Sequence, residues 1–272
     1  MLTLYDATTR GRATIQPGHR RELRVLAVTP GLAAPADPDL GPLRAFLLPD
    51  LLRRTAERRS LVPTVCEVEG PGEAGAGPLG GEVRTALNIH PPARIAPAGE
   101  PVARTAEYAG GEAPAFDIGT GDTGGLAGLD VIRYHAAPVG PITSSPGDGP
   151  QRWSEVTDRG LDPLAVRLAF MRARYRDGAD LSWAALTEAD TTLTGWRKSV
   201  AQWANSPSAA MPARYADAMT AAFEDDLDTV AALAVLPVLA ADADVAPGAK
   251  FETWAAADRL LGLDLARDIG RY

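Results

Sequence analysis

The spacing of hydrophobic residues along the chain changes near residue 150. Before that point, short apolar runs bounded by glycine and proline predict buried strands at 23–28, 61–68, 115–119 and 130–135. A helical pattern at 42–59 follows the first of these strands, and it places Leu43, Phe46, Leu47 and Leu51 on one face. Strand, helix and strand in this order predict a parallel crossover of an α/β nucleotide-binding sheet.

Beyond residue 150 the apolar spacing is helical. Helices are predicted at 153–159, 163–175, 182–203, 212–225, 230–240 and 250–261. Asp162 and Pro163 form an N-cap followed by proline at the first helical position. Short polar joints favour an antiparallel bundle. We expect Arg174 to face solvent, and we expect two apolar sets to pack together: Leu164, Leu168 and Met171 against Trp196, Val200 and Trp203.

Composition and charge narrow the function classes. The chain has 272 residues, of which 46% are hydrophobic, enough for one or two cores. A formal net charge of -8 argues against sequence-independent binding to nucleic acid. We expect no membrane span and no leader segment, and therefore a cytoplasmic protein. Cys66 is the only cysteine; its apolar neighbours predict a buried structural thiol, and a zinc site with two thiolates is excluded.

Six motifs occur in the order found in one family. They are LTLYDATTR at 2–10, ALNIHPP at 86–92, FDIGTG at 116–121, YHAAPVG at 134–140, RGLDPLAVRLAFM at 159–171 and DDLDT at 225–229. In these motifs the chain resembles the cysteinyl-tRNA synthetases and their shorter relatives, the mycothiol-pathway cysteine ligases. The resemblance implies a class I synthetase-type α/β fold: a Rossmann-like parallel sheet domain at 1–150, followed by an α-helical bundle at 151–272 and no anticodon-binding domain.

Three signatures of that family are altered. The HIGH signature, whose histidines stabilise the ATP phosphates during adenylation, is matched by Asp39-Leu40-Gly41-Pro42. A carboxylate and a proline remove hydrogen-bond donors there and add a charge that repels phosphate. The KMSKS loop is matched by residues 141–150, which contain no lysine. The first zinc-ligating cysteine of the family is matched within Leu26-Ala27-Val28, and we therefore expect no zinc.

The remaining candidate site residues could contact a nucleotide through backbone amides or small polar groups. They are Thr29, Gly41, Gly119, Gly121, Asp122, His135, Ser144 and Ser145. Ordinary turns are the competing explanation for the glycines, a structural role for His135, and an ordinary loop for the serines. We expect Asp225, Asp226 and Asp228 to form a solvated cluster at a helix end rather than a metal site.

Two functions remain open, and the sequence identifies no catalytic residue for either. The altered signatures favour a catalytically degenerate protein that keeps at most a cleft for a nucleotide or an amino-acid-derived adenylate, with ATP as the implied ligand, and acts through a protein partner. The alternative is an active ATP-dependent ligase that forms an aminoacyl adenylate from cysteine or another amino acid. Charging of tRNA is the least expected activity, so tRNA is not an expected partner.

Overall fold

A parallel β-sheet forms the first half of the molecule. The computed structural model describes residues 1–17, 21–69, 77–96, 116–121, 132–145 and 147–271. Within these ranges the sheet has five strands in the order β5-β4-β3-β6-β7, all parallel. The strands are β3 (Glu22–Thr29), β4 (Val62–Glu69), β5 (Arg94–Ala96), β6 (Phe116–Thr120) and β7 (Ile132–His135). A separate antiparallel hairpin joins β1 (Thr3–Asp6) to β2 (Gly11–Thr14). The predicted α/β class is confirmed.

The central strand β3 is apolar on both faces. Leu23, Val25 and Leu26 are fully buried, as expected for a strand that is covered on both sides. Leu26 is paired in register with Cys66 of β4. The Cys66 side chain is buried, as predicted, and burial raises the pKa of its thiol.

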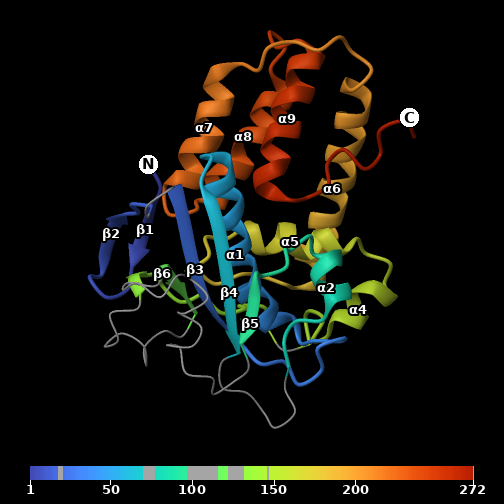
Figure 1. Ribbon diagram of the computed structural model, residues 1–272. Coiled ribbons are helices and arrows are strands. Elements are labelled where there is room, and N and C mark those ends of the chain that lie inside the picture. Colours follow the sequence, from blue (N-terminus) through green and yellow to red (C-terminus); the bar gives the residue numbers. More distant parts are fainter. Residues whose placement is uncertain (18–20, 70–76, 97–115, 122–131, 146, 272) are drawn as a thin grey trace.

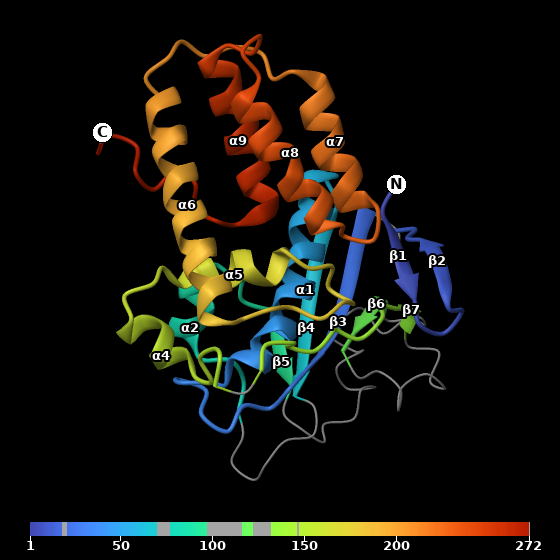
Figure 2. The same cartoon turned by 180° about the vertical axis from the view of Figure 1, so that it is seen from behind.

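The helix α1 (Leu40–Arg58) connects β3 to β4 and lies on one face of the sheet (Figures 1 and 2). All four residues predicted to face inward from this helix are buried. Two short elements follow β4 that the sequence pattern did not predict, α2 (Gly81–Ala86) and β5. Each is too short to show a hydrophobic period.

Six helices follow the sheet near the predicted positions. They are α4 (Trp153–Asp158), α5 (Pro163–Met171), α6 (Trp183–Trp203), α7 (Ala213–Glu224), α8 (Thr229–Ala241) and α9 (Pro247–Leu261). Helix α5 ends four residues earlier than predicted, and beyond its end the carbonyls of Ala173 and Arg174 accept hydrogen bonds from the Arg44 guanidinium. Helix α9 starts at Pro247 rather than at Lys250, since proline suits the first helical turn.

Helices α5, α6 and α9 share one core. Leu164, Leu168, Met171 and Val200 are buried, as predicted. The rings of Trp196 and Trp203 both pack edge-to-face on Trp254 of α9, with centroids 5.5 and 5.4 Å apart, a contact that the helical spacing did not predict.

One prediction for the bundle is wrong. Arg174 does not simply face solvent, because its guanidinium pairs with the Asp228 carboxylate and its side chain is only 35% exposed. Among the helices of the described ranges, none combines the length and the hydropathy that a membrane span requires.

Candidate functional site

The carboxyl ends of the parallel strands form the edge of the sheet farthest from α6–α9 (Figure 1). Open α/β sheets bind ligands at this edge. Thr29 ends β3, Gly119 is paired in register with both Leu26 and His135, and Gly121 follows β6. The structure therefore brings four predicted residues together, whereas Asp122 lies outside the described residues.

Gly121 is required by the backbone at this edge. Its φ is +82°, and a Cβ atom there would lie 1.9 Å from the carbonyl oxygen of Val28. Any other residue would collide with the end of β3. The close approach supports the explanation of Gly121 as a turn residue.

His135 joins the sheet to the β1–β2 hairpin. Its backbone N–H donates to Asp6 Oδ1 at 3.4 Å, and its carbonyl accepts from the N–H of Ala7 at 2.7 Å. The residue is only 9% exposed. These contacts support a structural role for the backbone of His135.

The two segments that match the HIGH and KMSKS signatures lie against each other. Gly41 is exposed in the first turn of α1, where a Cβ atom would lie 3.8 Å from Cγ1 of Ile142. The N–H of Leu40 donates to the carbonyl of Gln151 at 3.0 Å. Ser144 is half-buried and Ser145 is exposed in the same segment. The remaining predicted residues thus lie in the first turn of α1 and in the segment that approaches it at Ile142.

Backbone hydrogen bonds fasten the 141–150 segment to the chain after α5. Ala179 donates to the carbonyl of Pro141 at 2.9 Å, and Thr143 donates to the carbonyl of Ala179 at 2.8 Å. Trp183 donates to the carbonyl of Asp148 at 2.8 Å. The segment is therefore anchored at both ends.

Arg44 of α1 strengthens this anchorage, a role that the sequence pattern did not predict. The residue is 3% exposed, and its guanidinium donates to the carbonyls of Gly140 at 3.1 Å and Arg174 at 2.7 Å. Burial lowers the pKa of this guanidinium. The sequence feature that could have indicated this role is an arginine on the apolar face of a predicted helix, between Leu43 and Phe46.

Near the N-terminus of α1, the arginine is paired with a carboxylate and the exposed charged groups are negative. Arg152 lies 3.6 Å from Asp37, whose pKa is lowered chiefly by a hydrogen bond from the backbone of Ser154. Asp39 and Asp148 are exposed. These two carboxylates would repel the phosphates of a nucleotide.

The described residues offer no donor set for a metal. Within them, no three or more histidine, cysteine, aspartate or glutamate side chains stand close enough together to hold an ion. The resemblance implies a zinc site with two cysteines, but Cys66 is the only cysteine of the sequence, and its side chain is buried. The expected absence of zinc stays a prediction.

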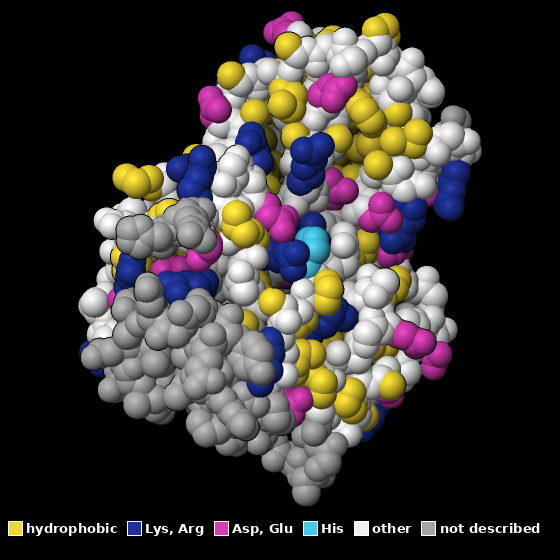
Figure 3. All heavy atoms as spheres, viewed as in Figure 1, with side chains coloured by type: hydrophobic (Ala, Val, Ile, Leu, Met, Phe, Trp, Pro, Cys, Tyr) yellow, Lys and Arg dark blue, Asp and Glu magenta, His cyan; other side chains and the backbone are white. Residues whose placement is uncertain are grey.

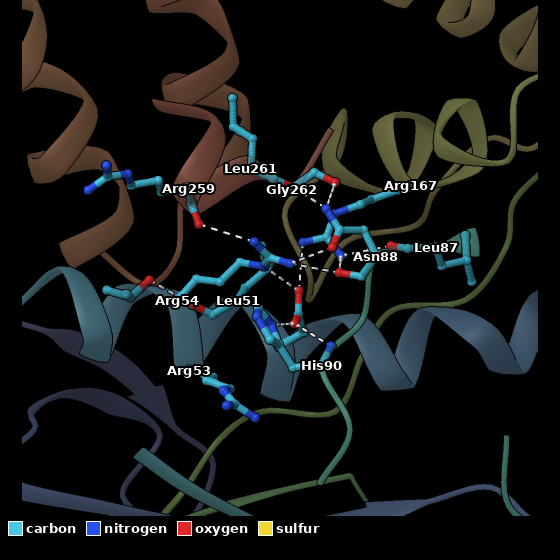
Figure 4. Close-up of polar contacts among 12 residues, drawn as sticks. Leu51, Arg53, Arg54, Leu87, Asn88, His90, Arg167, Arg259, Leu261 and Gly262 are labelled. Atoms are coloured by element: carbon cyan, nitrogen blue, oxygen red, sulfur yellow. Dashed lines mark hydrogen bonds and ion pairs between the residues drawn. The ribbon is translucent and has the colours of Figure 1, made fainter. Parts of the chain in front are cut away.

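A buried charge network, also missed from the sequence, joins the sheet to the bundle (Figure 4). The Asp50 carboxylate accepts from Arg54 at 2.8 Å, from Arg167 at 2.7 Å and from Nδ1 of His90 at 2.7 Å. Arg167 also donates to the carbonyls of Leu261 and Leu87. Burial alone would raise the pKa of Asp50, but Arg167, His90 and Arg54 lower it below its usual range.

The acidic turn between α7 and α8 is not a solvated cluster, which corrects the prediction. Asp226 is 2% exposed and accepts hydrogen bonds from the Tyr175 hydroxyl at 2.9 Å and from Arg176 at 2.7 Å. Asp228 is 7% exposed and pairs with Arg174. Asp225 pairs with Arg12. The arginines that neutralise this turn come from distant parts of the chain, so the local run of acidic residues was misleading.

Comparison with known proteins shows which proteins the chain is similar to. No protein-family model matches it. The L-cysteine:1D-myo-inositol 2-amino-2-deoxy-alpha-D-glucopyranoside ligase of Micrococcus luteus is 38% identical over 88 residues, 32% of this chain and 20% of the relative. The ligase of the same name from Thermobispora bispora is 38% identical over 107 residues, 38% of this chain and 25% of the relative. The cysteine--tRNA ligase of Novosphingobium aromaticivorans is 36% identical over 114 residues, 40% of this chain and 23% of the relative.

Over these aligned stretches the chain is similar to the cysteine ligases that these proteins represent. The family resemblance of the sequence motifs is thereby confirmed. The alignments span a quarter or less of each of these three cysteine ligases. The parallel sheet followed by helices agrees with the Rossmann-like class I synthetase fold expected for the family.

Proposed function

We propose that this chain is a catalytically degenerate cysteine ligase homologue that binds a nucleotide or an aminoacyl adenylate but does not form the adenylate. The observation that carries the proposal is the proximity of Gly41 to Ile142: a Cβ atom at Gly41 would lie 3.8 Å from Cγ1 of Ile142. The two residues belong to the segments that the motifs assign to the HIGH and KMSKS signatures. The segments meet, yet the histidines and lysines of the signatures are replaced.

The electrostatics at this place support the loss of catalysis. Adenylation builds negative charge on the ATP phosphates, and a catalyst must direct donors or cations at that charge. Here the exposed Asp39 carboxylate has the wrong sign, and the first N–H of α1 already donates to Gln151. Loss of one donor of this kind typically costs about 3 to 4 kcal/mol of transition-state stabilisation.

The carboxyl edge of the sheet supports the part of the proposal that concerns nucleotide binding. Gly119, Gly121 and Thr29 keep two strand ends close together, with little side-chain volume between them. We infer that the ligand is ATP or an aminoacyl adenylate. We also infer that the chain acts through a protein partner in the cytoplasm. Charging of tRNA is not part of the proposed function.

An exchange assay tests the catalytic half of the proposal. We expect no ATP–pyrophosphate exchange with cysteine or any other standard amino acid, with the Micrococcus luteus ligase as the positive control for cysteine. Exchange above that of a heat-killed sample would instead establish an active amino-acid ligase.

Calorimetry tests the binding half, with ATP and a non-hydrolysable cysteinyl-adenylate analogue as probes. Gly41→Glu adds a negative charge at the N-terminus of α1, where a Cβ atom has room, and should weaken binding of either probe. Gly195→Glu adds the same charge on α6, at a position with nothing within 4 Å, and should leave binding unchanged. No heat of binding for the unmodified chain, or equal affinity in the two variants, would contradict the proposed site.

A further inference from the structure

Helix α8 of the bundle carries no polar side chain on its outer face. Every residue of this helix from Val230 to Ala241 is apolar. A helix that is apolar on all sides is normally buried on all sides. In α8 only the inner side is buried, and it consists of Ala232, Leu233, Leu236 and Leu239. The outer side is open to solvent.

The exposed residues of α8 have a regular spacing. They are Val230, Ala231, Ala234, Pro237, Val238 and Ala241. Val230 is 41% exposed and Val238 is 59% exposed. Four of these residues, which we call the outer seam, follow one another at intervals of three, four and three: Ala231, Ala234, Val238 and Ala241. Apolar residues at these intervals are typical of a helix that packs along a second helix, and small side chains let the two helices approach closely.

The neighbouring helices of the bundle have charged outer faces. Glu188 and Lys198 are exposed on α6, and Arg214 and Asp217 are exposed on α7. Arg259 is exposed on α9. On the face of the molecule seen in Figure 3, charged side chains of both signs lie between the hydrophobic ones. The outer seam therefore differs from the rest of the bundle surface.

The two ends of α8 are complementary in charge. At the C-terminal end, the carbonyls carry the negative end of the helix dipole, and the exposed Asp244 carboxylate has no ion pair among the described residues. At the positive N-terminal end, the Asp228 carboxylate is already neutralised by Arg174, whose side chain is 35% exposed. An antiparallel pair of α8 helices would place each negative end beside a positive end, whereas a parallel pair would place like ends together.

The shape of the surface also suits an antiparallel pair. With a two-fold axis midway between Ala234 and Val238, Ala231 of each copy would face Ala241 of the other. Val230 would then lie opposite a shallow depression at the C-terminal end of α8, which is lined by Tyr215, Pro237, Val238, Ala241 and Asp242. In such a symmetric interface the same surface is used by both copies.

We propose that the outer seam is a dimer interface, in which α8 packs antiparallel against α8 of a second copy of this chain. Two copies, each with a net charge of -8, repel each other, and an uncharged face is where they can meet with the least repulsion. A helix face about 17 Å long contributes on the order of 300 Å² per copy. This is less than the roughly 800 Å² per partner of a standard interface, so the dimer is weak. The proposal does not rest on the proposed function.

Sedimentation velocity of the unmodified chain tests for the dimer. Between about 10 μM and 1 mM protein, we expect the weight-average mass to rise from that of one chain towards that of two. A mass that stays at that of one chain over this whole range would overturn the proposal.

Two matched variants test whether α8 forms the interface. Ala234→Glu places two carboxylates about 6 Å apart along the helix axes in the dimer, and it should weaken dimerisation about tenfold or more. Ala184→Glu adds the same charge at an exposed position of α6 and should leave dimerisation unchanged. Glutamate is a good helix former, and circular dichroism checks that both variants keep the fold. Equal dimerisation of the two variants would overturn the assignment of the interface to α8.

Cross-linking through introduced cysteines tests the antiparallel arrangement. The variants are Ala231→Cys and Ala241→Cys, at positions that face each other in the proposed dimer, whereas the native Cys66 is buried. Under mild oxidation, an equimolar mixture of the two variants should form a disulfide-linked dimer, and each variant alone should form much less. Cross-linking of each variant to itself but not to the other, or no cross-linking in the mixture, would overturn the proposed arrangement.

Discussion

The guanidinium of Arg167 donates to the carboxylate of Asp50 at 2.7 Å, and both side chains are 0% exposed. Asp50 comes from α1 of the sheet domain and Arg167 from α5 behind it. Burying either charge alone would be costly, so each residue depends on the other. This pair is the centre of the network that fastens α1 to the bundle.

Replacing Asp50 should therefore be severe. Asp50→Asn leaves Arg167 and Arg54 buried beside a neutral group, and we expect a loss of about 3 to 5 kcal/mol in the free energy of unfolding. Glu57→Gln removes a partner of Arg53 at the surface and should cost less than about 1 kcal/mol. Urea denaturation measures both, and similar midpoints would show that the network contributes little.

The neighbouring Gly262 should resist substitution for a steric reason. Its φ is +65°, and a Cβ atom there would lie 2.8 Å from Cζ of Arg54 and 2.9 Å from Nη2 of Arg167. Gly160→Ala is a matched control, since Gly160 has a φ of +72° with nothing within 4 Å. Gly262→Ala should lower the melting temperature more than Gly160→Ala does, because it adds a displacement of the two guanidiniums to the same backbone strain.

Helix α5 offers a test of core packing. Leu168 is fully buried, and Leu168→Ala should cost about 2 to 5 kcal/mol through lost burial and a cavity. Arg174 is unsuitable as the surface control because it pairs with Asp228. The exposed Gln202 of α6 serves instead, and Gln202→Ala should change the free energy of unfolding by less than about 0.5 kcal/mol. A Leu168→Ala midpoint equal to that of Gln202→Ala would refute this assignment of the core.

Acid should destabilise the fold through Asp162. Partial burial alone would raise the pKa of this carboxyl, but hydrogen bonds from Arg197 and from the backbone of Leu164 lower it overall. A carboxyl with a lowered pKa in the folded state stabilises the fold above its unfolded pKa of about 3.9, and the stabilisation is lost as the pH falls below that value.

The unfolding midpoints in urea at pH 7 and pH 3 test this dependence. Asp162→Asn should show a smaller decrease between the two than the unmodified chain. Asp244→Asn, at an exposed position after α8, should follow the unmodified chain. An equal decrease in all three proteins would exclude a role for Asp162.

The sequence predicted elements with a clear hydrophobic period and missed contacts that depend on distant charges. The apolar faces of β3, α1 and α5 were readable because each repeats along the chain. Asp50 and Arg167 are 117 residues apart, and their pairing has no local pattern. For the candidate site, the motifs selected the segments around Gly41 and Ser144, whereas their proximity at α1 and the anchoring role of Arg44 required the structure.

The bond between Tyr5 and Asp226 has a consequence for the order of folding. The N–H of Tyr5 donates to Asp226 Oδ1 at 2.8 Å, across 221 residues of sequence. An isolated two-stranded hairpin is marginally stable in water. During synthesis the β1–β2 hairpin leaves the ribosome more than 200 residues before its anchor between α7 and α8 does. These two strands therefore stay undocked while the intervening segment is translated, and in this interval they are most accessible to proteases and chaperones.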